Sequence, residues 1–138
     1  MKKIKERNIL SMAILTIVTL GFYTLYWIVQ TKNEIKDLGA DIPSVWLLIL
    51  PLGNIYFLYK YADGFVRYVK NGENTLSYFF ILLLPFLLSV ILPIKSISEI
   101  TNIRDFFIVY LPFLEIEFIS MIIIQLELNK LANKSIAK

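Results

Sequence analysis

Residues 8–31, which read NILSMAILTIVTLGFYTLYWIVQT, carry no charged side chain over 24 consecutive positions. A helix that crosses the roughly 30 Å hydrocarbon core of a bilayer needs about 20 apolar residues, because each residue advances the helix by about 1.5 Å. Two further charge-free runs, residues 42–59 and 74–94, are 18 and 21 residues long. A fourth apolar run, residues 106–126, is interrupted only by two glutamates. These lengths predict that the chain crosses a membrane four times.

The composition favours the same class of protein. Apolar residues make up 57% of the chain and charged residues 18%, whereas about 25% of the residues of a typical globular domain are charged. A length of 138 residues corresponds to one domain, so we expect a single membrane domain over residues 1–138. The predicted fold is an all-α integral membrane protein with four transmembrane helices at about residues 9–30, 44–59, 76–94 and 106–126.

Residues 60–71 are predicted to form an amphipathic helix after the second span. Its charged and aromatic side chains fall on different sides, so it would lie in the headgroup layer on the cytoplasmic side. Gly39 is expected to end the first helix, because glycine adopts the left-handed conformation that terminates helices. Pro51 and Gly53 are expected to bend or interrupt the second span.

The distribution of lysine and arginine predicts the orientation in the membrane. Ten of these residues fall on the side of the two termini and the 60–71 helix, and four fall on the other side. Because cytoplasmic loops carry the excess of positive charge, both termini are predicted to be cytoplasmic. Trp27 and Trp46 then both fall at the outer interface, which indoles prefer. The expected location is the cell membrane, with the lipid bilayer as the first partner.

The absence of cysteine and histidine from the chain excludes several kinds of chemistry. Disulfide scaffolds, thiolate catalysis, Cys/His zinc sites and imidazole catalysis all need these residues. The net charge is only +3 and the glycine patterns of nucleotide-binding loops are missing, so nucleic acid is not an expected partner. We therefore expect no enzymatic activity, no cofactor and no metal site.

Glu115 and Glu117 are the candidate functional residues inside the predicted membrane. If the fourth span covers residues 106–126, both carboxyl groups sit near its midpoint, at a cost of roughly 5–7 kcal/mol. Two positions apart on a helix, they point about 200° away from each other, so they cannot share one acid–base site. They could titrate with a proton or bind a cation. Alternatively, the helix could shift to about residues 113–131 and leave both near the surface.

A stripe of polar side chains on the first predicted span is a candidate for helix packing. Its members are separated by steps of three and four residues, which places them on one face of a continuous helix. Hydroxyl and amide groups on such a face suit hydrogen bonds between helices. A polar path facing Glu115 or Glu117 is the alternative. The stripe consists of Thr16, Thr19, Tyr23, Tyr26 and Gln30.

Two stretches near the N-terminus carry a resemblance to a known family. Residues 7–9 and the stretch from Thr19 to Trp27 resemble the T-L-G-x-Y-x-x-Y-W signature of a prokaryotic multi-pass membrane family, domain of unknown function forty-two thirty-four (DUF4234). The resemblance covers roughly residues 7–75, and residues 125–130, QLELNK, resemble the tails of longer members. It implies a multi-pass membrane protein and supplies no activity.

These observations lead to one expected function and one alternative. We expect a non-enzymatic membrane module that packs against itself, as a homo-oligomer, or against another membrane protein. The alternative is an oligomeric proton or cation conductor that uses Glu115 or Glu117 as the titrating group. An intramembrane enzyme that relies on carboxylates alone is the weakest possibility.

Overall fold

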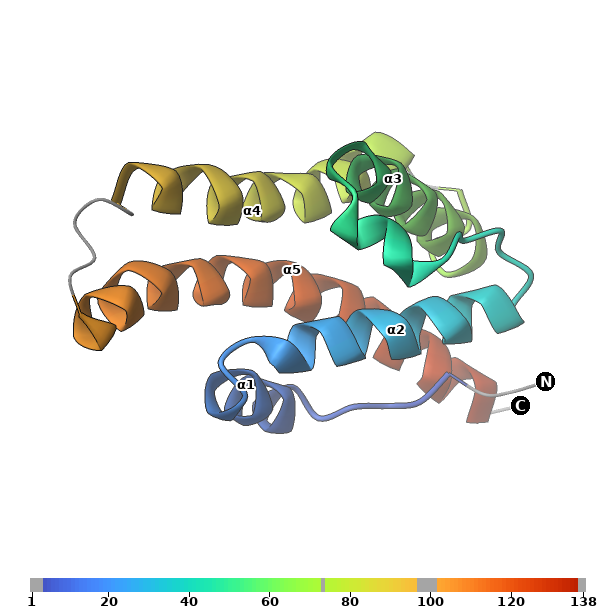
Figure 1. Ribbon diagram of the computed structural model, residues 1–138. Helices are drawn as coiled ribbons and strands as arrows, with labels where there is room; N and C mark the ends of the chain where they lie inside the picture. Colours follow the sequence, from blue (N-terminus) through green and yellow to red (C-terminus); the bar gives the residue numbers. More distant parts are fainter. Residues whose placement is uncertain (1–3, 73, 97–101, 137–138) are drawn as a thin grey trace.

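The computed structural model describes residues 4–72, 74–96 and 102–136 (Figure 1), apart from the side chains of residues 51, 89–96, 103–117 and 135–136. Within this part the chain is all-α, as predicted. Its elements, in order, are α1 (Ile9–Val18), α2 (Phe22–Asp37), the 3-10 helix η1 (Val45–Ile49), α3 (Pro51–Tyr68), α4 (Thr75–Ser96) and α5 (Ile103–Ile136).

The two longest helices, α4 and α5, run antiparallel and pack along each other (Figure 1). α3 packs against α4, and α2 contacts both α3 and α5. α1 lies at the end of α2 and also contacts α5. The first and last described segments lie next to each other at one end of the molecule (Figure 1).

A sharp corner separates α1 from α2, where the sequence predicts one continuous helix over residues 9–30. Leu20 and Gly21 both adopt left-handed backbone conformations, with φ values of 50° and 87°. The Gly21 N–H donates to the Thr16 carbonyl at 2.8 Å, and the Leu20 N–H donates to the Ile17 carbonyl at 3.1 Å. This pair of bonds is the Schellman arrangement that ends helices. The prediction of a single first span is therefore wrong.

The predicted helix breakers further along the chain are confirmed. α2 ends at Asp37, and Gly39 follows with a φ of 112°. The second predicted span, residues 44–59, is interrupted as expected, because η1 ends at Ile49 and α3 begins at Pro51. α3 then continues without a break to Tyr68, so the predicted separate helix over residues 60–71 is mostly the second half of α3.

Within the part of the chain that the structure describes, no helix combines the length and the apolar character that a membrane crossing requires. The predictions of four transmembrane helices and of a multi-pass cell-membrane protein with cytoplasmic termini are therefore wrong. One physical reason is that two of the three charge-free runs, residues 8–31 and 42–59, do not coincide with single helices. Residues 8–31 are divided between a helix of 10 residues and one of 16 residues, and the second of these continues into charged positions.

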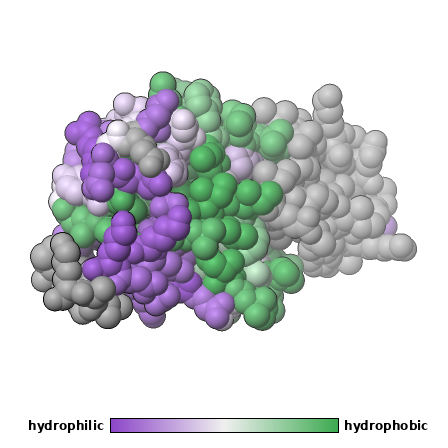
Figure 2. Space-filling view, turned by 180° about the vertical axis from the view of Figure 1, so that it is seen from behind, coloured by the Kyte–Doolittle hydropathy of each residue, from purple (hydrophilic) through white to green (hydrophobic). Residues whose placement is uncertain are grey.

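The core lies where α2, α3 and α5 meet. Its largest fully buried side chains include Trp27 and Ile35 from α2, Phe57 and Tyr61 from α3, and Ile124 from α5. Outside this core, many large apolar side chains remain exposed. Figure 2 shows that they gather in a band beside a strongly hydrophilic end of the molecule. The described part of this face thus has an apolar band and a hydrophilic end.

Candidate functional site

The side chain of Arg7 reaches from the extended segment before α1 to the carboxylate of Glu34 on α2. Its Nη1 donates to Glu34 Oε2 at 3.2 Å, and its Nη2 donates to Glu34 Oε1 in a second, short hydrogen bond. Both side chains are mostly buried, with 10% and 15% of their area exposed. A guanidinium that binds both oxygens of a carboxylate makes one of the stronger and more directional side-chain pairs. This pair attaches the N-terminal segment to α2.

Gln125 on α5 joins the same cluster from the opposite side. Its side chain is fully buried, and Oε1 accepts a hydrogen bond of 2.7 Å from Trp27 Nε1 on α2. Arg7 Nη1 also approaches this oxygen, at 3.5 Å. The amide Nε2 of Gln125 donates to Asn129 Oδ1 at 2.7 Å. Both ends of the Gln125 amide are therefore used inside the protein.

Asn129 completes the cluster by binding the backbone of Arg7. The Arg7 N–H donates to Asn129 Oδ1 at 3.0 Å, and Asn129 Nδ2 donates to the Arg7 carbonyl at 2.8 Å. The Asn129 side chain thus forms with Arg7 the two backbone hydrogen bonds that a residue of a neighbouring strand would form. We call Arg7, Trp27, Glu34, Gln125 and Asn129 the buried polar network.

A second polar contact lies beside this network, between α2 and α3. Tyr61 is fully buried, and its hydroxyl donates to Thr31 Oγ1 at 2.7 Å. Thr31 Oγ1 in turn donates to the Trp27 carbonyl at 2.9 Å. Burial raises the pKa of the Tyr61 phenol above its ordinary value, because the charged form would lose its hydration. Tyr61 is therefore neutral at physiological pH and acts as a hydrogen-bond donor.

The polar groups of the network are occupied by one another. Among the described residues, the buried side-chain atoms that lack a hydrogen-bond partner belong to Thr24 and Asn54, and neither is part of the network. A fully satisfied buried network stiffens the contacts between helices. The network therefore has a structural role, because it holds the N-terminal segment, α2 and α5 together.

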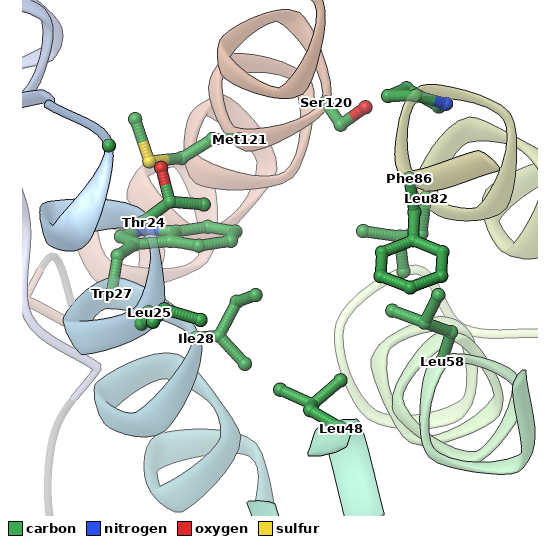
Figure 3. Close-up of a pocket in the computed structure, with 12 residues that line it drawn as sticks. Thr24, Leu25, Trp27, Ile28, Leu48, Leu58, Leu82, Phe86, Ser120 and Met121 are labelled. Atoms are coloured by element: carbon green, nitrogen blue, oxygen red, sulfur yellow. The ribbon is translucent and has the colours of Figure 1, made fainter. Parts of the chain in front are cut away.

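A separate, partly open cavity of about 190 Å³ lies between α2, α3, α4 and α5, with η1 at its edge (Figure 3). Its walls are mainly apolar. Trp27 projects from α2, Phe86 from α4 and Met121 from α5 (Figure 3). Thr24 lines the α2 wall, and its hydroxyl is buried and has no hydrogen-bond partner among the described residues. The cavity is thus an apolar space with one unused polar group beside it.

Charged side chains gather at the hydrophilic end, around Glu127 on α5. Lys130 Nζ lies 2.8 Å from one carboxylate oxygen of Glu127, and Lys70 Nζ lies 3.3 Å from the other. The hydrogen bond from Lys130, together with that from Lys70, holds the pKa of Glu127 below its ordinary value. This ion triad connects the end of the α3 segment to α5.

The predicted polar stripe is divided by the corner between α1 and α2. Thr16 is buried in α1, and its hydroxyl donates to the Met12 carbonyl of its own helix at 2.9 Å. The Thr19 hydroxyl donates to the Leu15 carbonyl at 2.7 Å and accepts from the Tyr23 N–H at 2.9 Å. These two hydroxyl groups bind their own chain locally and thereby shape the corner.

The remaining members of the stripe lie on α2. The rings of Tyr23 and Tyr26 are 5.8 Å apart, and Tyr26 is exposed, whereas Gln30 is half-buried. Glu115 and Glu117, the candidate residues for proton or cation binding, fall within α5, but their side chains lie outside the described part of the structure. The prediction that they carry a function stays a prediction.

The buried polar network was not anticipated as a site. Arg7 and Trp27 stand at the two ends of the stretches that resemble DUF4234, and Gln125 and Asn129 belong to the C-terminal stretch QLELNK, residues 125–130. The structure brings these two distant stretches into direct contact. The resemblance singled out the residues, but nothing in their spacing indicated that they bind each other.

Comparison with known proteins agrees with the resemblance over the first third of the chain. Among the curated proteins and among the solved structures, none matches this chain. The matched region includes Arg7, Trp27 and Glu34 of the buried polar network and stops before most of α3. Residues 7–53 match the family model described as "Domain of unknown function (DUF4234)".

Proposed function

We propose that this chain is a non-enzymatic interaction module, which pairs with a second copy of itself through the outward face of α1. The observation that carries the proposal is that one face of this helix is buried and the opposite face is exposed. Met12 and Thr16, four positions apart, face the core and are buried. The opposite face consists of large apolar side chains that are more than half exposed: Leu10, Ile14, Ile17 and Val18.

The spacing of these four residues supports a contact surface. Their positions fit one continuous stripe on a helix with 3.6 residues per turn. Leu20 and Phe22, at the corner that follows, extend the same apolar surface and are also at least half exposed. A monomer rarely leaves a contiguous apolar patch of more than a few hundred Å² exposed, and larger patches mark interaction sites.

The charge of α1 favours a second copy as the partner. The helix, residues 9–18, contains no charged residue. Two copies related by a twofold axis bring identical surfaces together, so an uncharged face meets its partner without like-charge repulsion. A charged partner would gain nothing from this face.

The size of the face predicts weak association. Fully burying a large aliphatic side chain contributes about 1.5–3 kcal/mol. Four such residues on each copy, roughly two-thirds exposed, would contribute about 8–16 kcal/mol in total. Association itself costs about 4–15 kcal/mol. Because the gain and the cost are of similar size, we expect weak association, with a dissociation constant of about the millimolar to micromolar range.

Sedimentation equilibrium over about 10 µM to 1 mM protein tests the proposal. We expect reversible dimerisation of the wild type and a shift to monomer for Ile17→Lys, because a lysine on this face would have to be desolvated in the dimer. The matched control is Leu52→Lys, which introduces the same charge at an exposed position on α3. Dimerisation should be retained in this control. A wild type that stays monomeric throughout, or an Ile17→Lys variant that dimerises as well as the control, would contradict the proposal.

A further inference from the structure

We infer that the cavity between α2, α3, α4 and α5 binds a small, uncharged aromatic molecule that carries one hydroxyl group. The first argument is size. The cavity measures about 190 Å³. An apolar cavity of about 150 Å³ in a protein interior stays dry and accepts benzene. The cavity is therefore large enough for a single six-membered ring with one substituent, such as phenol.

The walls determine that the ligand is uncharged. Among the described residues that line the cavity, none has an ionisable group with an ordinary pKa near neutrality, and the side chains are mostly aliphatic or aromatic. A charged ligand would lose its hydration without gaining an ionic partner, which is strongly unfavourable. Trp27 and Phe86 stand on opposite walls (Figure 3). A flat ring between them can pack against the faces or edges of both aromatic groups.

Thr24 supplies the polar anchor. Its Oγ1 atom is buried and has no hydrogen-bond partner among the described residues. The other polar side chains among the described residues of the wall are already engaged, since Trp27 Nε1 donates to Gln125 at 2.7 Å and Ser120 Oγ donates to the Ile81 carbonyl at 2.6 Å. Because Oγ1 is shielded from the cavity, the Thr24 side chain has to rotate about χ1 to present it. A ligand hydroxyl could then donate to Oγ1, which has no hydrogen-bond partner among the described residues.

The cavity also has an entrance for such a molecule. It is partly open, and Leu25, one of its lining residues, is half exposed, whereas Leu82 and Met121 are buried. Leu25 therefore lies at an exposed side of the cavity, where movements of its side chain occur on the picosecond to nanosecond timescale.

Titration followed by nuclear magnetic resonance tests this inference. The chain has two tryptophans, so its indole N–H resonances are assigned by comparison with Trp46→Phe. Trp27 lines the cavity, whereas Trp46 is 77% exposed and does not line it. With phenol and with toluene as probes, we expect a saturable shift of the Trp27 resonance and none of Trp46. Benzoate, which has the same ring and a charge, should produce no saturable shift of Trp27.

The role of Thr24 is tested by Thr24→Val, which removes the hydroxyl group and keeps a similar shape. We expect phenol to bind this variant about 3- to 10-fold more weakly than the wild type, while toluene binds within about 2-fold. Thr16→Val is the matched control, because it makes the same change in α1, away from the cavity. It should leave both affinities unchanged.

Three results would overturn the inference. The first is a Trp27 resonance that does not respond to phenol or toluene in the folded wild type. The second is saturable binding of benzoate that is as tight as that of phenol. The third is an equal loss of phenol and toluene affinity in Thr24→Val. Ile28→Phe, which extends a lining side chain into the cavity, provides a second check. If it binds both probes as the wild type does, the cavity is not where they bind.

Discussion

Replacing Gln125 by leucine tests the buried polar network at its centre. Gln125 is fully buried, and its two amide atoms bind Trp27 and Asn129, each at 2.7 Å. Leucine has a similar volume but can neither accept nor donate a hydrogen bond. The change therefore removes these two short hydrogen bonds and the longer one from Arg7 Nη1, at 3.5 Å, while it leaves the packing of α5 nearly intact.

The loss of stability follows from what each partner retains. The Trp27 N–H would remain buried without an acceptor, which costs about 1–3 kcal/mol. Asn129 Oδ1 would keep its bond from the Arg7 backbone and lose only the second donor, at a cost of about 0.5–1.5 kcal/mol. We expect the free energy of unfolding to fall by about 2–4 kcal/mol.

A double-mutant cycle with Trp27→Phe isolates the contribution of the hydrogen bond between Trp27 and Gln125. Phenylalanine has no N–H, so in this background Gln125→Leu no longer leaves a buried donor unpaired. Its cost should fall to about 0.5–1.5 kcal/mol, which gives a coupling energy of about 1–3 kcal/mol. Urea unfolding monitored by circular dichroism at 222 nm measures all four proteins, since the described fold is helical.

The control for this cycle is Leu126→Ala, one position along α5. Leu126 is 46% exposed, so its truncation should cost less than a truncation in the core. A coupling energy below about 0.5 kcal/mol between Trp27 and Gln125 would refute the reasoning. So would a Gln125→Leu variant that is no less stable than Leu126→Ala.

Three further predictions concern the corner, the ion pair and the charged end. Gly21→Ala should lower the free energy of unfolding by about 1–2 kcal/mol, because a side chain is disfavoured at a φ of 87°, whereas Leu20→Gly, at the neighbouring left-handed position, should not lower it. Urea unfolding measures both. Arg7→Met should cost about 2–4 kcal/mol because it leaves Glu34 unpaired, and adding Glu34→Leu should recover most of this loss; equal stability of the single and double variants would contradict the role of the pair. The lowered pKa of Glu127 means that its contribution to stability is complete above pH about 4.3 and is lost as the pH falls through the lower folded-state value. In Glu127→Gln, the free energy of unfolding should therefore fall less steeply between about pH 5 and pH 2 than in the wild type. An equally steep fall in both proteins would exclude this contribution.

Two interruptions of the helices, each set by the backbone preference of one residue, could be predicted from the sequence. The corner at Gly21 and the length of α3 could not. Gly39 and Pro51 interrupt the chain as expected, because each has a backbone preference that acts locally. The corner at Gly21 is not predicted, because the charge-free run continues on both sides of it and therefore indicates one continuous helix. A boundary was also expected near residue 60, where charges begin. None exists there, because charge alone does not end a helix and no glycine or proline lies between residues 54 and 63.

Sequence patterns report local properties of the chain, which explains both the incorrect membrane prediction and the absence of any prediction of the network. Counting uncharged residues measures how apolar a stretch is, but it does not show how the backbone divides that stretch. The contact between Trp27 and Gln125 joins residues 98 positions apart. Its formation depends on how α2 and α5 pack, and no local pattern in one chain encodes which buried amide meets which indole. The cavity arises in the same way, from side chains on several elements.

The bond between Arg7 and Gln125 has a consequence for how the chain folds during synthesis. These two residues are 118 positions apart. At roughly 5–20 residues per second, a ribosome needs about 6–24 s to produce the intervening polypeptide. During this time Glu34, only 27 positions away, is already present to neutralise the guanidinium. The early ion pair can therefore hold the nascent N-terminal segment against α2 until α5 emerges, so that the last helix docks onto a surface that is already in place.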